Sequence, residues 1–226
     1  MLWGAAGSVG TVAARIDQLR TTPRVLVHSL HSRRASHFAR IVAGIACLFI
    51  VLASDRSRAE EAVLPIAIQV ELLVKVASYD RNFQQRAGER ARIFIFTKPG
   101  NGDSTRVAAQ VEAGLARATE IGGLPHDDMI TPYRGAAELA NLCRAQRAAI
   151  VFFGPGFRED IADIRQALDG VDVLSVSAIP EYVEAGIVLG FDVASGRPEL
   201  LVNLSQAKRQ KVALRADVLK LMKVFQ

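Results

Sequence analysis

Hydrophobic and polar positions alternate between two periods along the later part of the chain, which predicts helices and strands in turn. Apolar residues at three- and four-residue spacing predict a first helix, with Ile66, Val70, Leu73, Val74 and Ala77 on one face. A short β-rich run at 92–97 follows and ends at Pro99-Gly100-Asn101-Gly102. Asp103 or Ser104 then caps a second helix, whose apolar stripe is Val107, Val111, Leu115 and Ala118.

The alternation continues through the middle of the chain. We expect a weak strand at 129–133, a helix at 135–146, and a strand at 149–153 that is apolar enough to be buried on both faces. A turn at Gly154-Pro155-Gly156 leads into a helix whose inner side carries Ile161, Ile164 and Leu168. A strand over 171–176 follows this helix. Strands that alternate with helices predict an α/β fold with a mainly parallel central sheet flanked by helices.

The C-terminal part has a different pattern. The runs 186–192 and 199–203 flank a turn at 194–197, which predicts an antiparallel hairpin. Two short C-terminal helices are expected after it, one from about Leu204 and one that carries Val218, Leu219, Met222 and Phe225.

The first 59 residues do not share this organisation. A basic stretch that contains Arg40 precedes an uncharged apolar run at 41–53, and small residues precede a cut between Ala59 and Glu60. The run is shorter than the roughly 20 residues that a membrane-spanning helix needs. We therefore expect a leader with a cleaved secretory signal peptide, and a single mature domain at 60–226. An uncleaved membrane anchor is the alternative, and the true start site and the export route, Sec or twin-arginine, stay open.

Removal of the leader changes the charge of the protein. The whole chain carries a formal charge of +5, but residues 1–59 hold eight of its 28 basic side chains and two of its 23 acidic ones. The mature part is therefore close to neutral. We expect no nucleic-acid partner, because the high basicity belongs to the leader.

Candidate catalytic residues are few in the mature chain. Its single histidine, His126, excludes a centre with several histidines, and His126-Asp127-Asp128 beside Pro125 is expected to be a polar loop. Its single cysteine, Cys143, can form no intrachain disulfide and is expected to be a small buried apolar residue on a helix. The two share no sequence motif that would make them a catalytic pair.

Two loops have some features of phosphate-binding loops. The run 98–105 has the residue types of a P-loop in the wrong order, and Gly154-Pro155-Gly156 lies between a strand and a helix. Glu159 and Asp160, however, occupy the positive end of that helix and would repel phosphate. We expect no catalytic, cofactor-binding or metal-binding residues, and no cofactor.

The C-terminal residues carry a family signature. Gly186-Ile-Val-Leu-Gly190-Phe191, a turn with Gly196-Arg197, and Val202-Asn203-Leu204-x-x-Ala207-x-Arg209 resemble the C-terminal signature of YfiR-type periplasmic proteins. The resemblance is good over about 173–225 and loose over 60–148. Four positions depart from the signature: Ala178 stands where an acid is usual, Lys211 replaces a glycine, and Arg215-Ala216 replaces a serine pair.

The resemblance implies a non-enzymatic function. YfiR-type proteins bind the periplasmic sensor domain of an inner-membrane diguanylate cyclase and hold it inactive, which lowers cyclic di-GMP and biofilm formation. The resemblance thus implies a periplasmic repressor, and a homodimer is a further candidate assembly. The alternative function is a periplasmic small-solute-binding protein, with its ligand at the carboxyl ends of the strands.

The motif residues are expected to be mainly structural. Glycines at strand positions predict close backbone approach or a bulge, and an asparagine between strand and helix is a natural N-cap. These expected structural residues are Gly186, Gly190, Phe191, Asn203, Leu204 and Ala207. The basic segment 208–223 is a solvated face, or else a docking surface for an acidic partner or membrane headgroups, with Lys208, Arg209 and Lys211 as the docking residues.

Overall fold

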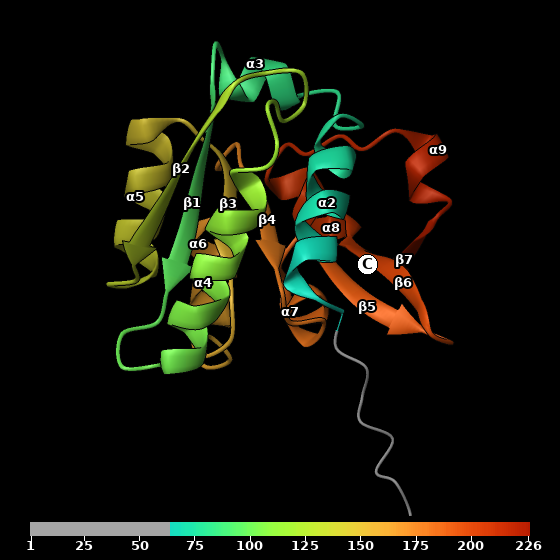
Figure 1. Ribbon diagram of the computed structural model, residues 1–226. Coiled ribbons are helices and arrows are strands. Elements are labelled where there is room, and N and C mark those ends of the chain that lie inside the picture. The colour runs from blue at the N-terminus through green and yellow to red at the C-terminus, as the bar shows by residue number, and fades with distance from the viewer. Residues whose placement is uncertain (1–63) are drawn as a thin grey trace, which may run out of the picture. The chain divides into compact units, whose positions relative to one another are not determined.

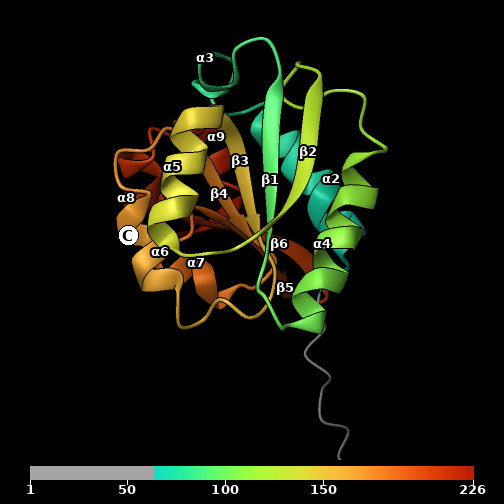
Figure 2. The same cartoon turned by 90° about the vertical axis from the view of Figure 1, so that its left-hand side faces the viewer.

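The computed structural model describes residues 64–226, so the predicted signal peptide and its cleavage site between Ala59 and Glu60 lie outside the described residues. Strands of this part form one sheet in the order β2-β1-β3-β4-β5-β6-β7 (Figure 1). Figure 2 shows α2 and α4 on one face of the sheet and α5 and α6 on the other. The domain thus has three layers.

The sheet is parallel except at its C-terminal end. The parallel strands are β1 (Ala91–Thr97), β2 (His126–Pro132), β3 (Ala148–Phe153), β4 (Leu174–Ser177) and β5 (Leu189–Ala194). β5 then pairs antiparallel with β6 (Arg197–Asn203), and β6 pairs parallel with β7 (Met222–Phe225). Ser195 and Gly196 both have positive φ, 50° and 75°, which is typical of a two-residue hairpin turn.

Helices occupy most of the connections. They are α2 (Ile66–Ala77), α3 (Phe83–Ala87), α4 (Gly102–Leu115), α5 (Ala136–Gln146), α6 (Ile161–Ala167), α7 (Glu181–Ala185), α8 (Leu204–Arg209) and α9 (Ala216–Leu219). The predicted α/β class, with its parallel sheet, hairpin and short C-terminal helices, is confirmed.

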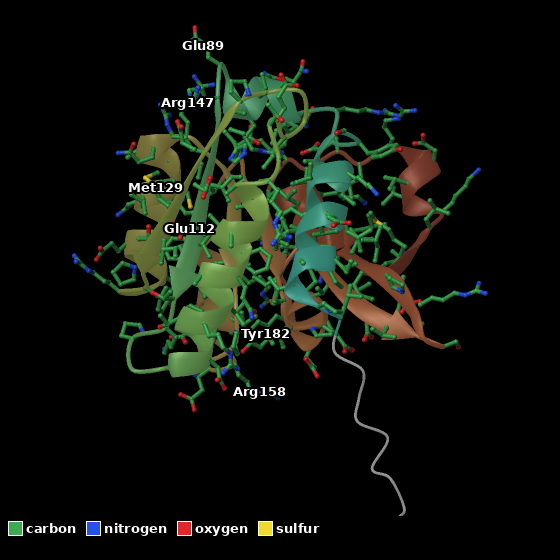
Figure 3. All side chains as sticks on the ribbon, in the orientation of Figure 1. Glu89, Glu112, Met129, Arg147, Arg158 and Tyr182 are labelled. Atoms are coloured by element: carbon green, nitrogen blue, oxygen red, sulfur yellow. The ribbon has the colours of Figure 1, made fainter. Side chains whose placement is uncertain are left out.

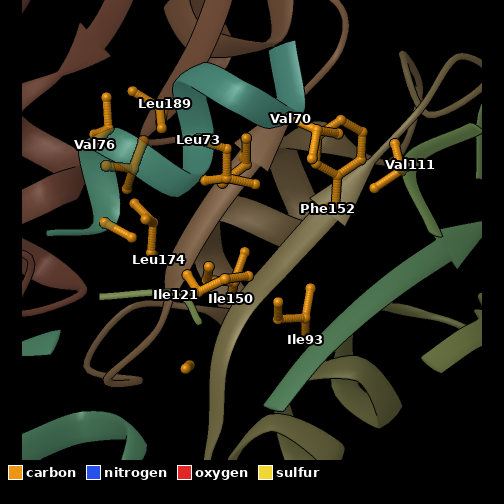
Figure 4. Close-up of a cluster of buried hydrophobic side chains, with 14 of the residues drawn as sticks. Val70, Leu73, Val76, Ile93, Val111, Ile121, Ile150, Phe152, Leu174 and Leu189 are labelled. Atoms are coloured by element: carbon orange, nitrogen blue, oxygen red, sulfur yellow. The ribbon is translucent and has the colours of Figure 1, made fainter. Parts of the chain in front are cut away.

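Two buried clusters hold the layers together. Figure 4 shows the one between the sheet and the α2–α4 layer, where Phe152 of β3 points toward Val70 of α2 and Val111 of α4. The other contains Phe94, Phe153 and Phe157 and packs against α5 and α6. Because β3 contributes to both clusters, all six of its residues are buried, as its continuous apolar run predicts.

Several local predictions were wrong. α4 begins earlier than expected, so its cap is Asn101, whose side chain accepts a hydrogen bond from the Ser104 amide at 2.8 Å, and not Asp103 or Ser104 itself. The strand expected at 171–176 begins at Leu174. The last expected helix ends at Leu219, and the residues after it form β7, because the Met222–Phe225 backbone pairs with β6.

Candidate functional site

The predicted motif glycines have different environments. Gly190 lies within β5, and a Cβ there would collide with Val183 of α7. Because glycine has no Cβ, α7 can lie close to this strand. Gly186 was expected in a strand, and this was wrong: it ends α7 with a φ of 126°, and a Cβ there would collide with Arg165. Both glycines let α7 pack closely against its neighbours.

Asn203 joins the hairpin to the helix after it. Its side-chain oxygen accepts a hydrogen bond from the Gln206 amide at 2.9 Å, which caps α8, and its Nδ2 donates to the Val183 carbonyl at 2.9 Å. Phe191 and Ala207 are buried, and Leu204 is half-buried against the same cluster. The motif residues therefore pack or form hydrogen bonds within the domain.

The predicted docking residues lie at the end of α8 and just after it. Lys208, Arg209 and Lys211 are all exposed. Arg209 pairs with Asp169 at 3.3 Å, and both side chains are solvent-exposed, so this pair contributes little to stability. We call Lys208, Arg209 and Lys211 the basic patch.

A buried ion-pair network, which sequence reasoning missed, fixes the backbone beside the basic patch. Arg86 donates to Asp80 and to Asp172, each at 2.7 Å, and also to the Lys211 carbonyl at 3.3 Å. Asp80 accepts a hydrogen bond from the Ala213 amide at 2.9 Å. We call Asp80, Arg86 and their bonds to residues 211–213 the Asp80–Arg86 clasp.

The clasp is buried more deeply than most ion pairs. The side chains of Asp80 and Arg86 are 0% and 1% exposed. Neither residue belongs to a recognisable motif, and both lie where the family resemblance is loose. Their only sequence feature is that they are oppositely charged residues between apolar segments. This pattern is too common to predict a buried ion pair.

His126 was expected in a polar loop, and this was wrong: it is the first residue of β2. Its Nε2 lies 2.9 Å from the carbonyl of Ala118, in the loop after α4, and its Nδ1 lies 3.1 Å from the Asp128 carboxylate. Cys143 lies on α5 in the cluster on the other face of the sheet. The structure therefore does not bring His126 and Cys143 together.

Cys143 is buried, with 2% of its surface exposed, as its helical apolar setting predicts. Burial raises the pKa of its thiol to about 12, because the charged thiolate is poorly solvated there. The folded state therefore prefers the neutral thiol. As pH rises above the ordinary value of 9.0, the unfolded chain ionises and the folded chain does not, so this group lowers stability in that range.

We expect Cys143 to be inert toward thiol reagents in the folded protein. Only the thiolate reacts, and the raised pKa leaves far less thiolate at pH 8 than in an ordinary cysteine. The rate of modification by iodoacetamide should therefore be slower in buffer than in urea, by about a hundredfold or more. Equal rates in the two conditions would place the thiol at the surface.

The strand order reverses between β1 and β3, which is the usual place for a ligand in a parallel sheet. Here the protein's own side chains fill this position. Lys98, after β1, donates to Asp160 at the start of α6 at 2.6 Å. A Cβ on Gly156 would lie 2.7 Å from Nδ2 of the Asn101 side chain. The two glycine-containing loops thus lie against each other at this edge of the sheet.

A cavity of about 460 Å³ lies nearby, between the start of α2 and α7 at the end of β4. Gln69 contributes to its wall and is 1% exposed; its Nε2 donates to the Leu64 carbonyl, and its Oε1 has no partner among residues 64–226. Charged side chains of both signs also line the cavity: Arg158, Glu181, Glu184, Asp192 and Lys223. Figure 3 labels Arg158.

Across 64–226, His, Cys, Asp and Glu side chains nowhere gather in groups of three or more that could hold a metal ion. Within the same residues no helix combines the length and apolar character that a membrane crossing requires.

The family assignment comes from comparison with known families. A model of YfiR/HmsC-like proteins matches residues 67–223, which is most of the chain. The chain belongs to the YfiR/HmsC-like family. The suspected relationship is thereby confirmed, and it extends over the region 67–148 where the sequence resemblance was loose.

Solved structures show the same fold at low identity. A conserved domain protein from Vibrio cholerae has a TM-score of 0.52 and 12% identity over 72% of this chain. An ABC domain in complex with L-Trp from Streptococcus pneumoniae and a substrate-binding protein with adhesive properties from Clostridium difficile each have a TM-score of 0.50, with 12% and 8% identity over 71% and 72% of this chain. This chain spans 60% of the length of each. No curated protein matches the sequence.

The structure gives physical meaning to one departure of this YfiR/HmsC-like chain from the expected signature. Lys211 has a φ of 54°, in the left-handed region that glycine adopts without strain. A lysine there costs about 1 kcal/mol. The turn keeps this conformation because the Asp80–Arg86 clasp holds its backbone, and the lysine adds a charge to the basic patch.

Proposed function

We propose that this protein is a non-enzymatic periplasmic repressor that binds the sensor domain of an inner-membrane diguanylate cyclase and lowers cyclic di-GMP output. The observation that carries the proposal is the family match over residues 67–223. Membership in the YfiR/HmsC-like family supports a periplasmic regulator of diguanylate cyclase signalling. The identity of the partner and the repression itself are parts of the proposal.

The proposed docking surface is the basic patch. Its three cations are exposed, and the clasp holds the adjoining backbone in one conformation, which reduces the entropy lost on binding. Tyr79, which is 36% exposed, lies beside it with its ring 5.5 Å from the Arg215 guanidinium. Tyrosine and arginine are frequent anchors at protein interfaces, so these two supply the proposed centre of the contact.

Reversal of the three charges should abolish repression. We expect Lys208→Glu, Arg209→Glu and Lys211→Glu together to weaken binding to an acidic sensor surface about tenfold or more, chiefly by slowing association. Cyclic di-GMP and biofilm should then rise toward the levels of a gene deletion. Binding to the purified sensor domain and cellular cyclic di-GMP are the measurements.

The matched control reverses three exposed arginines elsewhere, Arg106, Arg117 and Arg144, which gives the same change in net charge. We expect repression to persist in this control, and also in His126→Ala and Cys143→Ser, because neither residue has a catalytic partner. If gene deletion leaves cyclic di-GMP unchanged while His126→Ala abolishes an activity of the purified protein, the repressor proposal is wrong.

A small-solute-binding protein is the second candidate. The observation in its favour is the cavity beside α7, which Gln69 and charged side chains of both signs line. A small amphipathic solute with a hydrogen-bond donor would fit these groups. Thermal shifts of the protein with a panel of such solutes test this function, and Gln69→Leu should reduce any shift. No shift with any solute would leave only the repressor.

A further inference from the structure

Arginines gather at the amino ends of the central parallel strands. Arg92 is the second residue of β1 and lies opposite Ala148, the first residue of β3. Arg147 directly precedes β3, and Arg144 lies in the last turn of α5. Because β1 and β3 are parallel neighbours, these three arginines lie at the same edge of the sheet.

Helix α3 links this group to a fourth arginine. Arg147 Nη2 donates to the Gln85 carbonyl of α3 at 3.2 Å, and Arg92 Nη1 donates to the Gln146 carbonyl at 2.8 Å. Arg81 lies just before α3. Figure 1 shows α3 at one end of the domain. We call these four residues the α3 surface: Arg81, Arg92, Arg144 and Arg147.

Nearby carboxylates do not balance the charge of the α3 surface. Within residues 64–226, ion pairs engage the neighbouring Arg86 and Arg90, but none involves a residue of this surface. The carbonyl partners of two of its arginines are neutral, so they orient the guanidinium groups and leave their charge in place. Exposed acids in the adjoining segments, Glu89 and Glu120, offset only part of this charge.

Exposed acids gather at the opposite end of the sheet. Four of them follow the carboxyl ends of β3 and β4, where α6 and α7 begin: Glu159, Asp163, Glu181 and Glu184. Figure 3 labels Glu89 and Arg147 at the α3 end and Arg158 at this end. A planar anionic surface would attract the α3 end and repel the other, and would therefore hold the domain in one orientation.

We propose that the α3 surface binds the headgroups of anionic phospholipids at a membrane surface. A protein interface usually has an apolar centre, but none of the large apolar side chains that are exposed in 64–226 lies at 81–92 or 144–147. Headgroup binding needs only cations close to the anionic surface. Guanidinium groups also bind phosphate oxygens through two parallel hydrogen bonds.

A structural role explains only part of the α3 surface. Arg144 and Arg147 lie at the carboxyl end of α5, where cations stabilise a helix. Arg81 lies outside that helix and does not share this role. Its exposed charge is therefore available to a ligand.

Membrane binding would also place the basic patch near the membrane. The two surfaces adjoin, because Asn82 beside Arg81 donates to the Lys211 carbonyl at 2.7 Å. In the proposed function the sensor domain is held in the same membrane, so this orientation would favour their encounter. The headgroup binding itself does not depend on the proposed function, because vesicles contain no sensor domain.

Co-sedimentation of the exported protein with lipid vesicles tests the proposal. We expect binding to vesicles of equal parts phosphatidylglycerol and phosphatidylcholine, weaker binding as salt is added, and no binding to phosphatidylcholine alone. Arg81→Gln with Arg144→Gln should weaken binding about tenfold or more, because each cation near an anionic surface contributes about fivefold. Within residues 64–226 neither side chain bonds to another element, so the melting temperature should stay unchanged.

The matched control removes two exposed cations at the acidic end of the sheet. Arg134→Gln with Arg158→Gln changes the net charge equally and should leave vesicle binding unchanged. Glu89→Gln should strengthen binding about fivefold, because it removes an anion beside the α3 surface. Equal binding to both kinds of vesicle, or equal losses in the two double variants, would overturn the proposal. It also fails if vesicles do not bind and Arg81→Gln with Arg144→Gln instead weakens binding to the sensor domain.

Discussion

Phe152→Ala should lower the free energy of unfolding by about 3–5 kcal/mol. Phe152 is fully buried near the end of β3 and points between Val70 and Val111 (Figure 4). Loss of its ring removes apolar contacts and leaves a cavity that the neighbouring strands and helices fill only in part. For a domain of this size the melting temperature should fall by about 10 °C. Differential scanning calorimetry measures both quantities.

Leu221→Ala is the control for this prediction. Leu221 is 75% exposed, so its truncation should change stability by less than about 0.5 kcal/mol. A shift of only one or two degrees for Phe152→Ala, similar to that of the control, would mean that β3 does not lie at the centre of the core. Phe153 and the turn after it would then be candidates for a binding surface.

Arg86→Met should be as destabilising, by about 3–5 kcal/mol, because it leaves the buried carboxylate of Asp80 without its cation. The Asp80 side chain is fully buried, so water cannot replace the lost partner. The substitution also removes the bond to the Lys211 carbonyl, so the basic patch should lose its fixed backbone. Chemical denaturation measures the stability, and hydrogen exchange at residues 211–215 measures the local effect.

Arg215→Met is the matched control. Arg215 also pairs with an aspartate, Asp217 at 2.8 Å, but both side chains are 53% exposed. Its loss should cost less than about 1 kcal/mol. Equal stabilities of the two variants would contradict the structural role of the clasp. A variant in which both Asp80 and Arg86 are replaced by apolar residues should recover part of the loss, because no buried charge remains.

Long regular segments of this fold were predictable from the sequence. One pattern of apolar residues dominates in each of four elements: α2, β1, α5 and β3. The hairpin turn contains Gly196, and glycine readily adopts the positive φ found there. The errors occur where local pattern and tertiary pairing disagree. The apolar residues Met222 and Phe225 fit the pattern of a helix or of a strand. The segment forms a strand because its backbone pairs with β6.

The candidate site was less predictable than the fold. The basic patch is visible as a cluster of charges, because consecutive residues carry it. The clasp is not, since Asp80 and Arg86 gain their role only through contact with residues more than 120 positions later. The short helices α3 and α7 were also missed, because five residues are too few to display a period.

The clasp also affects the order in which the nascent chain folds. Asp80 and Arg86 emerge early in synthesis, but their partners at 211–213 follow 125 to 133 residues later. Until then the two charged side chains lack their hydrogen bonds to the backbone of that segment. Contacts so distant in sequence slow folding. The clasp, and with it the fixed backbone of the basic patch, can therefore form only after nearly the whole chain has been synthesised.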